Sequence, residues 1–284
     1  MRTVVIAAGL ALFMACCSAA SAAEPLKSWE TLRTTAPLSP ALRTGREDVG
    51  DAEIYFAVYG KGEPVILLHP ALGNSDYWAN QIGPLSQEFQ VIVVDLRGHG
   101  RSSGPVDALS YRLMARDVVR LIKDLKLKDP AIVGWGDGAV VGLELALRYP
   151  KRIGKLVAFG LAFDRSGLQP RPDQTPTFIE YVHKAQADHA LLSGNPAAFT
   201  RLLDGYEALW EREPNYTADD LANLKLPVVI MAAEHDEWVK PEHMVKAAEL
   251  IPSARLVTLP KTSHFAPWQA AKNFDDALLM ALRH

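Results

Sequence analysis

Residues 131–147 read AIVGWGDGAVVGLELAL. A short apolar run with β-branched residues leads into a cluster of glycines, after which apolar and small residues recur at helical spacing. The pattern predicts a strand, a tight turn and a helix. Gly134 and Gly138 lie two residues before and two residues after Gly136, which is the spacing of a turn that holds a catalytic nucleophile. The sequence therefore predicts such a turn with glycine at the position of the nucleophile.

The small residues of this turn have a steric reason. A side chain at the tip of a sharp strand-to-helix turn sits in strained backbone, and strand and helix can approach only if the flanking residues are small. Gly134 and Gly138 meet this requirement around position 136. Gly136 itself has no side chain with which to attack a substrate, so the frame of the turn is present and the nucleophile is absent.

Two other interpretations of the turn stay open at the level of sequence. A shift of the register by one residue would make Asp137 a carboxylate nucleophile. In that register Trp135 would occupy a position that needs a small residue. Residues 134–139 also fit the G-x-G-x-x-A pattern of dinucleotide-binding turns. The acidic residue expected at the end of the following strand arrives late, at Asp164.

Short apolar runs recur along the chain, with helical patterns such as 113–127 and 244–250 between them. The apolar runs cover residues 64–68, 91–95, 131–133, 156–159, 228–231 and 255–259, after an alternating strand at 53–59. Fully apolar runs are typical of strands buried in a parallel sheet. The alternation predicts an α/β fold with a mostly parallel, doubly wound sheet and ligands bound at the carboxyl ends of the strands.

The sequence predicts three successive segments. Residues 1–23 carry a basic start, an apolar run and small residues, as a secretory signal peptide does, so we expect an exported protein, periplasmic or secreted. Residues 24–44 hold three prolines and form an extended lead-in. Residues 45–284 form one domain, in which about 161–226 interrupt the alternation and predict a helical lid over the carboxyl ends of the strands.

Both cysteines, Cys16 and Cys17, lie in the signal segment. The mature chain is therefore expected to have no thiol, disulfide or thiolate metal site. Lipid attachment at Cys16 competes with cleavage near Ala23, although Phe13 and Met14 fit that motif poorly.

Charge and composition limit the partners. The formal net charge is −3 and like charges do not form runs, which argues against a nucleic-acid or anionic-membrane partner. After the signal segment we expect no membrane span. His235 and His243 lack a spacing that indicates a metal site, and we assign neither a metal nor a cofactor. The expected partner is a small-molecule substrate, and the oligomeric state stays open.

Five motifs occur in a fixed order along the chain. They are LLHPALGN at 67–74, DLRGHGRS at 95–102, GWGDG at 134–138, EHD at 234–236 and SHF at 263–265. Together they resemble the α/β-hydrolase family, most closely its valacyclovirase-like and proline-iminopeptidase-like branch of lid-bearing serine hydrolases. The resemblance covers nearly everything after about Glu47 and implies the α/β-hydrolase fold.

The resemblance also implies roles for individual residues, in the order nucleophile, acid, histidine. Asp236 would orient the imidazole of His264, and His264 would act as the general base. Gly136 would be the vacant nucleophile position. The backbone N–H groups of Ala71 and Asp137 would form the oxyanion hole.

The sequence departs from the family once more before Ala71, where Pro70 replaces the usual glycine and offers no N–H. The resemblance places His69 beside the oxyanion hole, as a structural residue in the wall of the substrate pocket. The aromatic residues near these motifs are expected to line the pocket, namely Trp78, Trp135, Trp238 and Phe265. Packing in the core would explain these residues equally well. A neighbouring loop is expected to brace the turns near the site through Asp95, Arg97, His99 and Arg101.

The sequence thus predicts a hydrolase of a small ester, amide or lactone, built for acyl transfer of the Ser-His-Asp type. With Gly136 in place of the nucleophile, activity is expected to be absent or very weak. The glycine is either an engineered change, a natural loss that leaves a non-catalytic small-molecule binder, or a gap in which a water is activated by His264 and Asp236. The Asp137 carboxylate could also attract a substrate amine.

Overall fold

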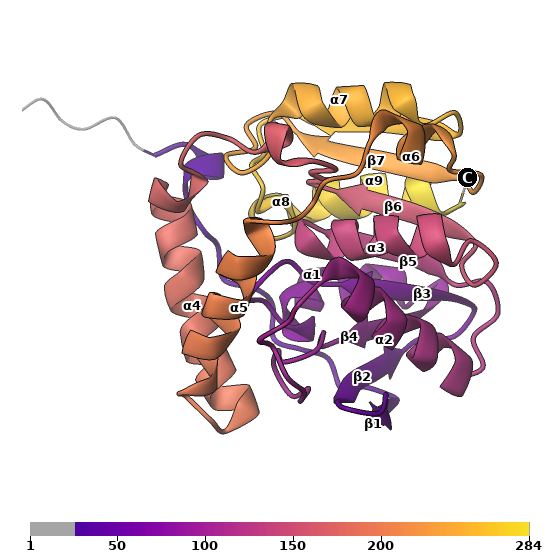
Figure 1. Cartoon of the computed structure of the whole chain (residues 1–284), viewed down its shortest axis with the longest axis vertical. Coiled ribbons are helices and arrows are strands. Elements are labelled where there is room, and N and C mark those ends of the chain that lie inside the picture. Colours follow the sequence, from indigo (N-terminus) through magenta and orange to yellow (C-terminus); the bar gives the residue numbers. More distant parts are fainter. Residues whose placement is uncertain (1–25, 284) are drawn as a thin grey trace, which may run out of the picture.

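A computed structural model describes residues 26–283 as an eight-stranded sheet with helices on both faces (Figure 1). The strand order is β1-β2-β4-β3-β5-β6-β7-β8. The strands are β1 (Arg43–Asp48), β2 (Glu53–Tyr59), β3 (Glu63–Leu68), β4 (Phe89–Val94), β5 (Ala131–Trp135), β6 (Lys155–Phe159), β7 (Val228–Ala233) and β8 (Ala254–Leu259). Both pairings of β2 are antiparallel and all the others are parallel, which confirms the predicted fold class. The predicted signal peptide and Cys16 lie outside the described residues.

The helices that cover the sheet are α1 (Ala79–Leu85), α2 (Tyr111–Asp124), α3 (Asp137–Arg148), α7 (Pro241–Leu250), α8 (Ala266–Gln269) and α9 (Ala271–Arg283). Figure 1 shows α2 and α3 side by side in front of the sheet, and α8 and α9 behind it. Short 3-10 turns lie at Ser28–Glu30, Ser75–Trp78, Arg165–Gly167 and Pro172–Gln174. No helix within residues 26–283 has the length and apolar character needed to cross a membrane.

The core of the fold lies on both faces of the central strands. Residues 65–68 of β3 are at most 1% exposed, and β5, β6 and β7 are buried almost as fully. Burying one such aliphatic side chain contributes about 1.5 to 3 kcal/mol, so the apolar runs seen in the sequence supply most of the driving force for this sheet. The carboxyl ends of the parallel strands all lie at the same edge of the sheet, and the candidate site lies at that edge.

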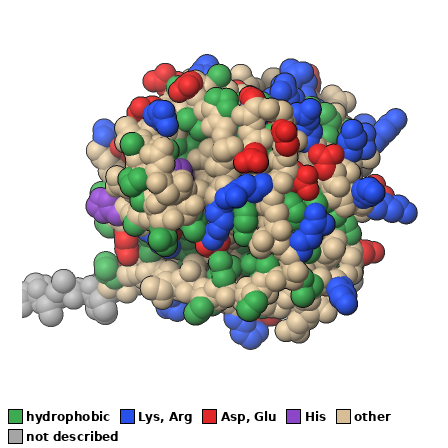
Figure 2. Space-filling view, turned by 90° about the horizontal axis from the view of Figure 1, so that it is seen from below, with side chains coloured by type: hydrophobic (Ala, Val, Ile, Leu, Met, Phe, Trp, Pro, Cys, Tyr) green, Lys and Arg blue, Asp and Glu red, His purple; other side chains and the backbone are tan. Residues whose placement is uncertain are grey.

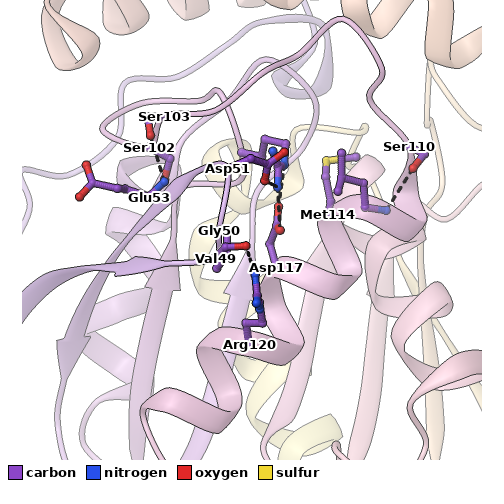
Figure 3. Close-up of polar contacts among 12 residues, drawn as sticks. Val49, Gly50, Asp51, Glu53, Ser102, Ser103, Ser110, Met114, Asp117 and Arg120 are labelled. Carbon is purple, nitrogen blue, oxygen red and sulfur yellow. Dashed lines mark hydrogen bonds and ion pairs between the residues drawn. The ribbon is translucent and has the colours of Figure 1, made fainter.

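The loop after β4 is held by charged contacts, as expected for a bracing element. The buried guanidinium of Arg97 donates to Asp117 of α2 at 2.8 and 2.9 Å and to Asp51 of the β1–β2 turn at 2.8 Å. Figure 3 shows Asp51 and Asp117, whose carboxylates both accept from this guanidinium, and Arg120 of α2, which donates to the backbone of Val49. Because a buried charge is costly unless it is paired, this network has a structural role.

A segment of residues 161–226, here called the insertion, lies between β6 and β7. It contains α4 (Pro176–Ser193), α5 (Ala198–Trp210) and α6 (Ala218–Ala222). Figure 1 shows α4 and α5 packed side by side along one end of the sheet. The molecular face seen in Figure 2 intersperses basic and acidic side chains rather than gathering one sign of charge.

The lead-in runs from residue 26 to β1, which begins at Arg43 inside the predicted extended segment. Gln269 of α8 donates from its amide to the carbonyl groups of Trp29 at 3.2 Å and Thr31 at 3.0 Å. The Trp29 ring stacks on His235 with 4.3 Å between ring centroids. The lead-in is therefore packed against the loops that follow β7 and β8.

Candidate active site

The turn between β5 and α3, here called the elbow, has Gly136 at its tip. Gly136 has φ +57° and ψ −119°, a conformation that residues with side chains rarely adopt. Its N–H donates to the carbonyl of Phe159 at 2.9 Å, and its own carbonyl accepts from Ala139 at 2.9 Å. The register in which Asp137 sits at the tip is therefore wrong, because Asp137 is already the first residue of the helix.

The glycines of the elbow are required by close contacts between strand and helix. A Cβ on Gly134 would clash with the backbone of Gly138 and Ala139, and a Cβ on Gly138 would clash with the Leu68 carbonyl. A Cβ on Gly136 would instead lie 3.0 Å from Nε2 of His264. The steric prediction from the sequence is confirmed, and a side chain at position 136 would point at an imidazole.

His264 and Asp236 come together at the carboxyl edge of the sheet. His264 follows β8 and Asp236 follows β7, and Nδ1 of the imidazole lies 3.0 Å from the Asp236 carboxylate. That carboxylate also accepts the N–H groups of Trp238 at 2.9 Å and Val239 at 2.7 Å. Because a carboxylate accepts, Nδ1 carries the proton, and Nε2 is the basic nitrogen that faces Gly136.

The electrostatic surroundings of His264 favour its protonated form. Burial alone lowers the pKa of the imidazole, but the charge and hydrogen bond of Asp236 together with Glu237 and Asp137 outweigh burial, so the pKa is raised. A raised pKa makes the neutral imidazole a stronger base. The pair is thus arranged to take a proton from a group placed beside Gly136.

Glu237 holds the backbone next to His264 and was missed by the sequence analysis. Its carboxylate accepts the N–H of His264 at 2.9 Å, the hydroxyl of Thr177 at 2.9 Å and the hydroxyl of Ser263 at 3.2 Å. Thr177 belongs to α4, so the same carboxylate ties the insertion to the histidine loop. Its position directly after Asp236 was the only signal in the sequence.

Replacing Glu237 with glutamine is expected to lower the pKa of His264, because the substitution removes one of the negative charges that raise it. The measurement is an NMR titration of the imidazole resonances in protein with labelled histidine. Glu234→Gln is the matched control, since Glu234 accepts from the Lys261 N–H and is not among the charges acting on His264. An unchanged pKa in the Glu237 variant would contradict this assignment.

Two backbone N–H groups at the site are free to bind an oxyanion. Asp137 is the first residue of α3. At this end of a helix the N–H groups have no partner within the helix, and the positive end of the helix dipole lies there. Ala71 follows β3, and its carbonyl accepts from the Tyr181 hydroxyl of α4. Within residues 26–283 neither N–H donates a hydrogen bond to another residue, and both residues line one cavity with His264. Pro70 leaves the Ala71 N–H in place.

Two adjoining cavities open at the elbow beneath the insertion. The smaller cavity is lined by Pro70, Ala71, Leu72, Asp137, Phe178, Tyr181, Trp210, Trp238, His264 and Phe265. The larger cavity, of about 460 Å³, shares Asp137, Phe178, Trp210 and Trp238 and adds Gly136, mostly with apolar residues. This volume lies in the range of pockets that bind small molecules.

The carboxylate of Asp137 lies where the two cavities meet. Its Oδ1 atom accepts the Tyr111 hydroxyl at 2.6 Å and the Trp210 indole N–H at 2.9 Å. Burial is the largest influence on this carboxyl, and its pKa is raised. Asp137 thus contributes a backbone donor on one side and a buried carboxyl group on the other.

The structure corrects part of the predicted pocket lining. Trp238 and Phe265 line the smaller cavity, but Trp78, Trp135 and His69 are fully buried in the core and line neither cavity. The two indole rings pack edge to face against each other at 5.9 Å. His69 accepts the Leu96 N–H at 3.0 Å through Nε2, which makes it structural, as the resemblance implied.

Several residues of the lining had no signal in the sequence. Tyr111 comes from α2, and Phe178, Tyr181 and Trp210 come from the insertion, all far from the motifs. Among residues 26–283 no three His, Cys, Asp or Glu side chains are grouped to hold a metal ion. His243 instead stacks on Phe163 at 4.0 Å and accepts the N–H of the same residue.

Comparisons with known proteins agree with the fold. Residues 65–277 match the family model described as the alpha/beta hydrolase family. A protein named as a carbamate hydrolase, RutD of Azorhizobium caulinodans, is 28% identical over 251 residues, covering 81% of this chain and 95% of that protein. A pimeloyl-acyl-carrier-protein methyl ester esterase of Nitrosospira multiformis is 27% identical, covering 76% and 93%. The solved enol-lactonase of Burkholderia xenovorans LB400 has a TM-score of 0.68 at 21% identity, covering 84% and 100%, and shows the same fold.

Proposed function

Because this chain belongs to the alpha/beta hydrolase family, whose members include the esterases and the carbamate hydrolase it resembles, we propose a site for small esters, amides or lactones that lacks its nucleophile. In this proposal Gly136 stands where the family carries a serine, and the insertion is a lid. His264 is the base, Asp236 orients it, and the N–H groups of Ala71 and Asp137 hold the oxyanion.

One observation carries the proposal, namely the orientation of the imidazole. Nε2 of His264 lies 3.0 Å from the point where a Cβ on Gly136 would stand. Loss of the nucleophile of such a triad costs about 10⁶ in turnover, whereas the oxyanion hole and binding retain roughly 10³ to 10⁴ over water. The native chain is therefore proposed to hydrolyse its substrate very slowly, through a water activated by His264.

A second candidate is a small-molecule binder without turnover, favoured by the cavity of about 460 Å³ that adjoins a glycine. The two candidates are separated by thermal unfolding and product formation measured on the same ester panel. Ligand binding raises the unfolding temperature in both cases. Product formed faster than in buffer supports slow hydrolysis, and a raised unfolding temperature without product supports the binder. If the protein shows neither product nor a raised unfolding temperature, both candidates are contradicted.

The charge of the pocket predicts which substrates enter it. Its charged side chains, apart from His264, are Asp137, Asp173 and Glu207, and neither Lys nor Arg belongs to the described lining. We expect 4-phenylbutanamide to bind about tenfold more tightly than 4-phenylbutanoate at pH 8, a difference of about 1.4 kcal/mol. Isothermal titration calorimetry measures both.

Asp137→Asn is expected to reduce the difference in affinity between 4-phenylbutanamide and 4-phenylbutanoate, because the substitution removes the innermost negative charge of the pocket. A matching amine, 4-phenylbutylamine, tests in the same series whether Asp137 attracts a substrate ammonium. Equal binding of acid and amide by the native protein would contradict the charge argument.

We also propose export of the protein, supported by the basic start, apolar run and small residues of positions 1–23. Fractionation of cells that produce the whole chain, followed by the mass of the recovered protein, tests this. Recovery of the uncut chain from the cytoplasm alone would contradict export.

A further inference from the structure

We propose that the site catalyses proton transfer at carbon, removing a proton next to the carbonyl of an uncharged aromatic ketone through His264 and holding the enolate on the N–H groups of Ala71 and Asp137. This activity goes beyond the proposed hydrolysis, because no acyl group leaves and no water adds. It uses the parts of the site that remain when a hydroxyl is absent from the elbow.

The first support is the free face of the base. Nδ1 of His264 is held by Asp236 at 3.0 Å, so Nε2 is the nitrogen available for a proton. A Cβ built on Gly136 would lie 3.0 Å from Nε2 and 3.4 Å from the Pro70 ring, so Nε2 faces the space that a side chain at position 136 would fill. A serine here would give Nε2 its hydroxyl as a partner, whereas the glycine leaves room for a substrate C–H to approach.

The second support is the pair of unengaged donors. An enolate carries its charge on the former carbonyl oxygen, as the tetrahedral intermediate of acyl transfer does, so a hole built for one suits the other. Ala71, Asp137 and His264 line the same cavity. A carbonyl bound to the two N–H groups therefore presents its neighbouring carbon to the imidazole, which is the geometry required for abstraction of a proton beside a carbonyl.

The third support is the character of the cavity wall. Aromatic rings surround the position, with Phe178 and Trp238 at 4.6 Å and Trp210 and Trp238 at 5.8 Å between centroids. A mostly apolar wall lowers the local dielectric, which strengthens the interaction between an enolate and its donors. It also favours a ketone with an aromatic ring, and the acidic lining disfavours an anion.

The step is balanced without any further reagent. The C–H bond breaks and its electron pair forms the carbon–carbon double bond of the enolate, while the C=O pair moves onto oxygen. The proton goes to Nε2 of His264, and the imidazolium is stabilised by Asp236. The N–H proton of the imidazolium exchanges with the solvent. In D₂O a deuteron then returns to the same carbon and regenerates the ketone, so the net result is replacement of hydrogen by deuterium.

A weak base is sufficient for this chemistry where the enolate is well held. Ketosteroid isomerase uses a carboxylate with a pKa of about 4.6 and relies on its oxyanion hole. The pKa of His264 is raised by Asp236, Glu237 and Asp137 against the effect of burial, which makes the imidazole the stronger base of the two. General-base catalysis contributes about 10²- to 10⁴-fold.

The experiment follows the methylene protons of phenylacetone by NMR in D₂O with purified native protein. The expected result is exchange at least about 10²-fold faster than in matched buffer. His264→Gln is expected to return the rate to that of the buffer. His183→Gln is the matched control for surface imidazole, because His183 is exposed on α4, and it is expected to exchange as the native protein does.

Gly136→Ser separates this activity from hydrolysis. Its hydroxyl would take Nε2 as a partner, so slower exchange than in the native protein is expected together with faster ester hydrolysis. Exchange in the native protein no faster than in buffer, or equal exchange in His264→Gln, would overturn the proposal. If the native protein shows no exchange but the serine variant gains esterase activity, proton transfer is contradicted and the proposed function is supported. If the native protein shows exchange but the serine variant gains no esterase activity, proton transfer is supported and the proposed function is contradicted.

Discussion

Gly136→Ser is expected to raise the rate of hydrolysis of p-nitrophenyl esters by about 10³-fold or more. The Cβ of the new residue would lie 3.0 Å from Nε2 of His264, so its hydroxyl would be within reach of the base. Asp236 and the donors of Ala71 and Asp137 are already in place. The rate is measured over a series of acyl lengths.

Gly136→Ala is the control that isolates the hydroxyl. It adds the same Cβ and the same backbone strain at φ +57°, which costs about 1 to 3 kcal/mol, but it brings no nucleophile. Its esterase rate is expected to stay at that of the native chain. A folded serine variant that gains nothing would show that the pocket is not built for acyl transfer, and Pro70 would then be the residue to replace next.

Gly138→Ala is expected to lower the free energy of unfolding by about 3 kcal/mol or more. A Cβ at this position would meet the carbonyl groups of Leu68 and His69, and backbone at the end of β3 cannot move aside as a flexible side chain can. The free energy of unfolding is measured by urea denaturation.

Gly83→Ala provides the comparison for the same chemical change. Gly83 lies within α1, and nothing stands within 4 Å of a Cβ built there. Alanine is favoured over glycine inside a helix by about 1 kcal/mol, so this variant is expected to be as stable as the native protein or slightly more stable. Equal stability of the two variants would contradict the close approach of β3 to the elbow.

The fold was predictable because its central strands are fully buried. Runs such as 64–68 and 228–231 stand out in the sequence, since both faces of these strands lie under helices. The strand β1 was not predicted. Its residues RTGRED are polar because it is an edge strand whose side chains are mostly exposed, so it carries no apolar signal.

The chemistry of the site was predictable where it follows strand ends. Asp236 and His264 lie in the loops that follow β7 and β8, and the order of the motifs predicted the pairing of their side chains, which the 3.0 Å contact shows. Glu237 could not be found in this way, because its partners Thr177 and Ser263 are distant in the chain.

The lining of the pocket was the least predictable part. Trp135 belongs to β5, where successive side chains point to opposite faces of the sheet, and its ring faces the core rather than the cavity. Trp210 of the insertion lines both cavities, although no motif surrounds it. Aromatic residues suit a core and a pocket equally well, so their type alone could not separate the two roles.

The central claim is that the elbow presents no nucleophile to an otherwise assembled base and oxyanion hole. The most direct measurement is the intact mass of the protein after treatment with a fluorophosphonate, which reacts with an activated serine. We predict no adduct on the native chain or on Gly136→Ala, and a single adduct on Gly136→Ser that is lost when His264→Gln is added. An adduct on the native chain, or none on a folded serine variant, would contradict the account.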